Sequence, residues 1–253
     1  FLFLCLICTG CGKKQEKKTD TLGEIVKRDK LIIGVRDDTA PFGFRDKNGN
    51  LIGYDIDLAR LIAKGILKDE KKVDFVPVTA SNRIMKLNSG EVDILIATMS
   101  ITEQRQQILD FSLPYHIAGQ AILTNRSSKA TSLKDFEGKK LIIVFGSTSE
   151  NNLRTNVPEI EVLGFKNYKD AFNALKMGKA QGITADDTIL YNLSLGDNSV
   201  KILQKRYSQE PYAVALRKEK ESTRLLREID YIIDNLQSTG RLNKMREKWN
   251  IKN

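Results

Sequence analysis

The chain has 253 residues, of which 41% are hydrophobic and 29% charged. Its 41 Lys and Arg side chains outnumber 32 Asp and Glu, which gives a formal net charge of +9. These values fit a globular protein of one large or two modest domains, and they exclude a coiled coil, a collagen and a disordered chain.

The first eleven residues combine an apolar run, Phe1–Thr9, with all three cysteines of the chain, Cys5, Cys8 and Cys11. We interpret this segment as the end of an export signal peptide, and residues 12–28 as a flexible, polar tether. The sequence around Cys11 resembles a bacterial lipoprotein processing site, although Cys8 stands where that pattern has an aliphatic residue. An ordinary cleaved leader is the alternative. We expect an extracytoplasmic or periplasmic protein, lipid-anchored to the outer face of the cell membrane through Cys11.

Beyond the tether, short β-branched runs alternate with amphipathic helical patterns, which is typical of an α/β protein. The predicted strands cover residues 31–35, 73–78, 92–97, 141–145, 161–165 and 180–185. The predicted helices cover residues 55–66, 82–88, 168–177, 221–239 and 241–249. Because strands and helices alternate, we expect a mostly parallel sheet with crossover helices, followed by a second, smaller unit of the same kind.

The segment Gly53–Ile66, with the sequence GYDIDLARLIAKGI, resembles the signature of the extracellular solute-binding proteins (family 3) of bacterial amino-acid ABC importers. The resemblance extends from Leu31 to Trp249 and is closest to the glutamate/aspartate-type members. The further motifs that carry it are, in chain order, Ala40–Phe42, Ser81–Ile84, Ser89–Asp93, Ile96–Arg105, Phe111–Tyr115, Gly146–Thr148 and Asp186.

This resemblance implies a two-lobed, periplasmic-binding-protein-like (type II) clamshell, in which each lobe is a mostly parallel sheet flanked by helices. Lobe 1 is then discontinuous, with residues 29–117 and 212–253, and lobe 2 comprises residues 118–211. The chain is expected to be a monomer and not an enzyme. It would capture a free amino acid by closure of the lobes and deliver it to the membrane subunits of an ABC permease.

The first candidate contact is Arg105, in the first turn of a short helix that Thr102 is expected to cap. A guanidinium grips a carboxylate with two parallel hydrogen bonds, so Arg105 suits the α-carboxylate of an amino acid. From the residue type alone, a solvated surface arginine is the alternative, but the resemblance implies the carboxylate-binding arginine here. Thr98, Met99 and Ser100 end the preceding predicted strand, where ligands of open α/β sheets bind.

Asp186 is the candidate acceptor for the ammonium group of the ligand, although either Asp186 or its neighbour Asp187 also suits a helix N-cap. The resemblance favours Asp186 for the ligand. Ser147 and Thr148 follow a glycine at a strand-to-helix turn, so their N–H groups could reach the carboxylate as the lobes close. The candidate walls of the pocket, which could equally be core aromatics, are Phe42 and Tyr212.

Two further arginines, Arg36 and Arg83, bear on the side chain of the ligand. A buried guanidinium without a counter-charge is costly, so both favour an acidic ligand, glutamate or aspartate. The glutamate- and aspartate-binding members of the family are similar to this chain at both positions. Cystine stays open because it carries a second carboxylate, and Arg36 could instead pair with Asp37 or Asp38 on the surface.

Three other classes of function are weaker interpretations. Some relatives of this fold are dehydratases or cell-wall lytic enzymes, but the only histidine, His116, lies in the predicted hinge and no cysteine follows Cys11. Because the sequence has neither a metal-ligand cluster nor a Gly-rich phosphate loop, we expect no cofactor and no metal. A nucleic-acid binder would suit the net charge, yet the lysines are interleaved with acidic residues. A sensor module is the remaining rival.

Overall fold

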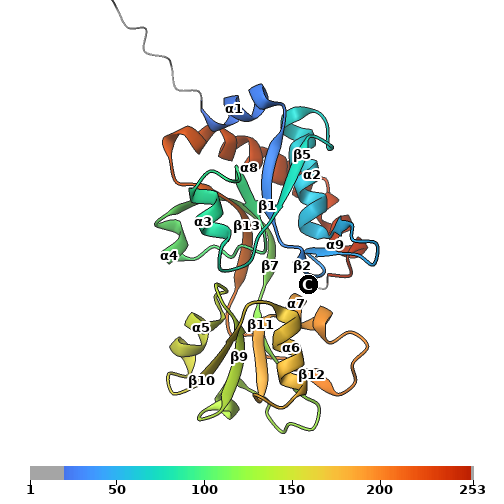
Figure 1. Ribbon diagram of the computed structural model, residues 1–253, viewed down its shortest axis with the longest axis vertical. Coiled ribbons are helices and arrows are strands. Elements are labelled where there is room, and N and C mark those ends of the chain that lie inside the picture. Colours follow the sequence, from blue (N-terminus) through green and yellow to red (C-terminus); the bar gives the residue numbers. More distant parts are fainter. Residues whose placement is uncertain (1–19, 252–253) are drawn as a thin grey trace, which may run out of the picture.

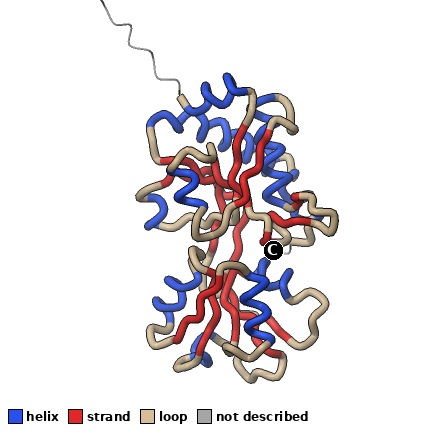
Figure 2. The backbone as a smooth tube through the Cα atoms, viewed as in Figure 1, coloured by secondary structure: helices blue, strands red, loops and turns tan. Residues whose placement is uncertain are grey.

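Residues 20–251 are described by the structure, a computed structural model, and they form two lobes that Figure 1 shows one above the other. Each lobe contains a five-stranded sheet with helices packed against it (Figure 2). The predicted lipid-attachment residue, Cys11, lies outside the described residues. Within the described range, no helix is both long enough and apolar enough to cross a membrane.

The sheet of the first lobe has the strand order β5-β1-β6-β13-β7. Its strands are β1 (Leu31–Val35), β5 (Val73–Pro77), β6 (Ile94–Ile96), β7 (Leu109–Ala118) and β13 (Glu210–Arg217). Around it lie α1 (Thr21–Arg28), α2 (Tyr54–Leu67), α3 (Arg83–Asn88), α4 (Glu103–Gln106), α8 (Thr223–Ser238), α9 (Arg241–Lys248) and the 3₁₀ helix η2 (Lys220–Ser222). A small three-stranded sheet adds β2 (Asp38–Thr39), β3 (Gly43–Arg45) and β4 (Leu51–Ile52).

The sheet of the second lobe has the strand order β10-β9-β11-β8-β12. Its strands are β8 (Gln120–Asn125), β9 (Lys140–Val144), β10 (Glu161–Phe165), β11 (Gly182–Asp186) and β12 (Val200–Ile202). Its helices are α5 (Ser149–Asn156), α6 (Tyr168–Lys176), α7 (Asp187–Leu193) and the 3₁₀ helix η1 (Leu133–Phe136).

In each sheet four strands run in one direction and one strand runs against them. In the first lobe β5, β1 and β6 are parallel, and β13 runs antiparallel to β6 and β7. In the second lobe β10, β9 and β11 are parallel, and β8 runs antiparallel to β11 and β12. The sheets are therefore mostly parallel, as the sequence predicted, and each becomes mixed through a single antiparallel strand, β13 in the first sheet and β8 in the second.

The lobes are connected through β7 and β13, which lie side by side as an antiparallel pair (Figure 1). The pair extends from Leu109 and Arg217 at one end to Ala118 and Glu210 at the other. After Gly119 the chain enters β8 of the second sheet. Chain segments before and after the second lobe thus build the first sheet together, and the exact lobe boundaries at 117–118 and 211–212 stay predictions.

Helix α1 corrects the prediction that residues 12–28 form a flexible tether. Asp20 caps this helix by accepting a hydrogen bond of 2.8 Å from the N–H of Gly23. Leu22 and Ile25 are buried in the core that α8 also lines. Residues 21–28 therefore belong to the folded lobe, because the helix has an N-cap and an apolar face to bury.

Candidate functional site

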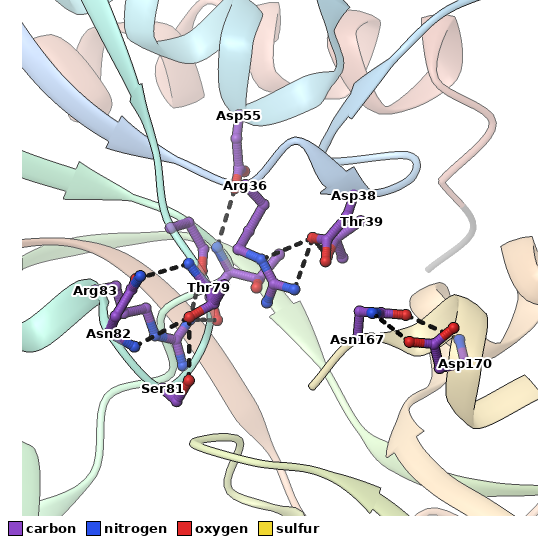
Figure 3. Close-up of polar contacts among 12 residues, drawn as sticks. Arg36, Asp38, Thr39, Asp55, Thr79, Ser81, Asn82, Arg83, Asn167 and Asp170 are labelled. Carbon is purple, nitrogen blue, oxygen red and sulfur yellow. Dashed lines mark hydrogen bonds and ion pairs between the residues drawn. The ribbon is translucent and has the colours of Figure 1, made fainter. Parts of the chain in front are cut away.

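Four strand ends meet where the lobes face each other. In the first lobe, β1 and β6 are neighbours and lead into Arg36 and Thr98. In the second lobe, β9 leads into Gly146 and Ser147, and β11 ends on Asp186. Ligands of open α/β sheets bind outside the carboxyl ends of the strands, so this interface is the candidate site. Figure 3 shows its first-lobe side chains and the opposite start of α6.

Arg36 is buried in this interface, and it pairs with a counter-charge of its own, Asp38, whose side chain is partly exposed. The side chain of Arg36 is 1% exposed, and its Nε and Nη2 donate to Oδ1 of Asp38 at 3.0 and 2.7 Å. Across the interface, the guanidinium carbon lies 6.0 Å from the ring centre of Tyr168 in α6. Pairing with Asp38 was an alternative from the sequence, but it was expected on the surface. The guanidinium of Arg36 is instead buried between the lobes, and the carboxylate of Asp38 is partly exposed.

Arg83 is also buried, and it donates to backbone carbonyls. Its Nη1 bonds to the carbonyl oxygens of Ala97 and Thr98 at 2.5 and 3.1 Å, and its Nη2 to that of Gly146 in the other lobe at 3.3 Å. Burial, with the charges of Arg105 and Arg36, lowers the pKa of Arg83 to about 9. Its guanidinium thus binds the backbone that follows β6 in the first lobe and one carbonyl of the second lobe.

Asp55 holds Thr98 in place and was not among the residues predicted for the site. The backbone of Thr98 has a left-handed φ of 48°, and its N–H donates to Oδ2 of Asp55 at 3.0 Å. Asp55 is fully buried in the first turn of α2, and burial raises its pKa to about 7. The signal was available in the sequence, since a carboxylate inside an apolar helix face requires a buried partner.

Arg105 lies in the first turn of α4, as predicted from its capping residue. The hydroxyl of Thr102 accepts a hydrogen bond of 3.2 Å from the N–H of Arg105. The Nη1 of Arg105 donates to the carbonyl of Ser100 at 2.8 Å, and its Nη2 to the carbonyl of Gly146 at 3.2 Å. The guanidinium therefore spans the two lobes at the edge of the interface.

Asp186 and Asp187 point to different partners. The hydroxyl of Tyr212 donates to Asp186, which is 8% exposed. Burial first, and then the charge of Glu210, raise the pKa of Asp186 to about 7. Asp187 instead forms an ion pair with Arg206 at 2.7 Å. Of the two carboxylates, Asp186 is the one that faces the interface.

Thr148 is linked to the strand that connects the lobes, whereas Ser147 bonds within its own turn. The hydroxyl of Thr148 donates to Glu210 at 3.0 Å, and Asn152 of α5 donates to the same carboxylate at 2.8 Å. The hydroxyl of Ser147 turns back to the carbonyl of Val144 at 2.7 Å. Glu210, missed in the sequence because it sits in an extended run, fixes the start of α5. Beside it a cavity of about 380 Å³ is also lined by Arg105 and Ser147.

Among the remaining predicted residues, Met99 does not reach the interface. Its side chain is fully buried in the apolar cluster of the first lobe with Val78 and Leu87. Its prediction as a site residue is wrong.

Phe42 and Tyr212 form part of one buried aromatic group. Their ring centres lie 5.2 Å apart, and the ring of His116 lies 5.3 Å from that of Phe42 and 5.4 Å from that of Tyr212. Both rings are fully buried, yet the hydroxyl of Tyr212 reaches Asp186. These rings pack beneath the site, and the hydroxyl of Tyr212 is the part of the group that contacts a site residue, Asp186.

Two lobes that close on a set of converging charged and polar groups define the molecule as a two-lobed solute-binding protein. The chain belongs to the bacterial extracellular solute-binding proteins, family 3, whose family model matches residues 31–252. The family resemblance and the two-lobed α/β fold expected from the sequence are thereby confirmed. Members of this family bind free amino acids outside the cytoplasm and work with ABC permeases.

The names of several similar proteins state which amino acid those proteins bind. The chain is 39% identical over 257 residues to the ABC transporter glutamine-binding protein GlnH of Bacillus subtilis (strain 168), covering 98% of this chain and 93% of that protein. It is 43% identical over 203 residues to the glutamine-binding protein of Geobacillus stearothermophilus, covering 79% and 78%. A solved structure of an ancestral arginine-binding protein bound to glutamine is 37% identical, with a TM-score of 0.82 over 89% of this chain and 99% of that chain.

Proposed function

We propose that the chain captures L-glutamine for an amino-acid ABC importer. The observation that carries this proposal is the ion pair that the buried Arg36 forms with Asp38. The acidic ligand expected from the sequence required Arg36 and Arg83 to lack partners, so that a ligand carboxylate would neutralise them. Arg36 has a carboxylate of its own, and Arg83 donates to three carbonyls. A neutral side chain suits this site better, and the named ligand of two relatives is glutamine.

The two charged ends of the ligand are assigned to opposite lobes. Arg105 would bind the α-carboxylate, which is a stronger acceptor for a guanidinium than the carbonyls that it now contacts. Asp186 would accept from the ammonium group. Polar contacts around these two residues would come from Thr98, Ser100, Ser147 and Thr148, and the aromatic support from Phe42 and Tyr212.

Capture would proceed by closure, since groups from both lobes can contact one ligand only when the lobes are together. The liganded, closed shape is then what a permease recognises. Membrane attachment through Cys11 and a monomeric state are parts of the same proposal, as are the lobe boundaries given above.

Calorimetric titration of residues 20–253 with glutamine, glutamate, aspartate, cystine and arginine tests the ligand. Glutamine is expected to bind far more tightly than glutamate, because a carboxylate would enter a site whose arginine is already neutralised. Tighter binding of glutamate or aspartate would restore the acidic-ligand hypothesis. Conversion of the bound amino acid to another product would indicate an enzyme.

A further inference from the structure

Among the described residues, Arg36 has one guanidinium nitrogen, and Asp38 one carboxylate oxygen, that forms no hydrogen bond. The Nε and Nη2 of Arg36 both donate to Oδ1 of Asp38, and the hydroxyl of Thr39 donates to the same oxygen at 2.9 Å. Within residues 20–251, Nη1 of Arg36 donates to no other atom and Oδ2 of Asp38 accepts from none. The pair is neutral as a whole, and it leaves one guanidinium nitrogen and one carboxylate oxygen without a hydrogen bond in the described part of the chain.

The pair lies next to the second lobe, and Asp38 is its exposed member. Strand β2, which begins at Asp38, contacts α6 of the second lobe, and Arg36 lies over Tyr168 in the first turn of that helix. Figure 3 shows Arg36 and Asp38 in the first lobe and Asn167 at the start of α6 in the second. The side chain of Asp38 is 33% exposed, against 1% for Arg36, so its carboxylate is the accessible member.

We propose that Asp38 is the residue that selects an amide over a carboxylate at the end of the ligand's side chain. The proposal rests on the function proposed above, in which the ligand is glutamine. The amide NH₂ donates to Oδ2 of Asp38 while the amide oxygen accepts from Nη1 of Arg36. A glutamate carboxylate has no proton to donate, and it would meet the like charge of Asp38 at close range. Arg36 thus attracts the oxygen of either ligand, and Asp38 rejects the acid.

The test compares Asp38→Asn with Asp37→Asn by calorimetry, using glutamine and glutamate as the two ligands. Asp37 is the matched control, because it is the adjacent acid but forms an ion pair with the half-exposed Arg45 at 3.1 Å. The amide introduced by Asp38→Asn can donate to a carboxylate, so glutamate should bind this variant more tightly than it binds the parent. The ratio of the two dissociation constants is expected to shift toward glutamate by about tenfold or more in Asp38→Asn and to stay constant in Asp37→Asn.

The outcomes separate this proposal from the proposed function. A parent protein that prefers glutamate would overturn both. A parent that prefers glutamine, together with an Asp38→Asn variant that melts normally and keeps the parental ratio, would overturn only the role of Asp38. Asp38→Ala is the second variant, and it should lose glutamine affinity and discrimination together. If neither variant folds, Asp38 is a structural partner of Arg36 and the selectivity role is rejected.

Discussion

Three arginines converge on the interface, and at the residue scale their partners explain what the site can bind. Arg36 is neutralised by Asp38, while Arg83 and Arg105 share the carbonyl oxygen of Gly146. A carbonyl carries only a partial charge, so a ligand carboxylate would be the better partner for Arg105. Arg83 is less available, because two of its bonds go to the strand end in its own lobe. A single ligand carboxylate, the α-carboxylate, would therefore provide Arg105 with a charged partner.

Replacing Arg105 by lysine tests the carboxylate assignment. We expect Arg105→Lys to weaken binding of every amino-acid ligand by about 1.5–3 kcal/mol, since an ammonium cannot reproduce the planar two-bond contact. Arg154→Lys is the control, because Arg154 is half-exposed and pairs with Glu150 one helical turn away. Calorimetry on both variants decides the point. Parental affinity in a folded Arg105→Lys protein would remove Arg105 from the site.

The acidity of Asp186 predicts how binding depends on pH. Its carboxyl group has a pKa of about 7 without ligand, raised by burial and by Glu210, and also by Asp187, while Tyr212 and Arg105 lower it. Only the ionised form attracts an ammonium group, so binding below about pH 7 must first release a proton. The dissociation constant should therefore rise by up to about tenfold per pH unit as the pH falls from 7 toward 5.

Asp55 also has a pKa of about 7, so the pH profile needs a control. Asp186→Asn is expected to bind more weakly and to flatten the profile. His116 does not titrate in this window, because burial lowers its pKa to about 4. An equally steep profile in Asp186→Asn would assign the titration to Asp55 and refute the role of Asp186.

At the element scale, α1 provides a direct test of where the folded body begins. Ile25 is fully buried, whereas the next residue, Val26, is 53% exposed. Ile25→Ala should lower the free energy of unfolding by about 2–5 kcal/mol, because it opens a cavity in the core. Val26→Ala should change it by less than about 0.5 kcal/mol. Equal effects in denaturant titrations would mean that α1 does not pack as described.

The elements with a clear repeating pattern were predictable from the sequence. The expected strands at 31–35 and 161–165 coincide with β1 and β10, and the helix at 168–177 differs from α6 by one residue. The antiparallel strands β7, β8 and β13 were not predicted, because polar residues of the hinge and site interrupt their apolar alternation. In α8, Ile233 lies on the buried face of the helix. The helical spacing in the sequence predicted Ile232 on that face, but Ile232 is only partly buried.

The site was predictable in part, for a related reason. Motifs locate residues such as Arg105 and Asp186, but their partners are distant in the chain: Gly146 is 41 residues from Arg105. A contact between residues so far apart in the sequence depends on how the two lobes pack, and a local sequence pattern does not predict that packing. The pair of Arg36 with Asp38 is the exception, since the two residues are two positions apart, but the burial of Arg36 follows only from the fold.

At the scale of the whole molecule, the closed arrangement depends on a close approach at Gly146. A side chain there would place its Cβ 2.5 Å from the carbonyl group of Ala80 in the other lobe. Gly146→Ala should therefore hinder closure and weaken ligand binding by about tenfold or more, equivalent to about 1.4 kcal/mol. The loss should appear in calorimetry at any pH.

The control for Gly146→Ala is Gly178→Ala, in the second lobe. Gly178 has a similar left-handed φ of 71°, against 79° for Gly146, but no atom lies within 4 Å of its added Cβ. Both variants should lose about 1–2 kcal/mol of stability from backbone strain, and only Gly146→Ala should also lose affinity. Equal affinity in the two variants would show that the lobes need not approach at this point.

Closure upon glutamine is the central claim, and small-angle X-ray scattering on the 20–253 protein tests it most directly. The radius of gyration is expected to fall when glutamine saturates the protein, because Arg105 and Asp186 can hold one ligand only with the lobes together. Glutamate at the same concentration should leave it unchanged. A radius that stays constant with glutamine bound, or that falls equally with glutamate, would contradict the account.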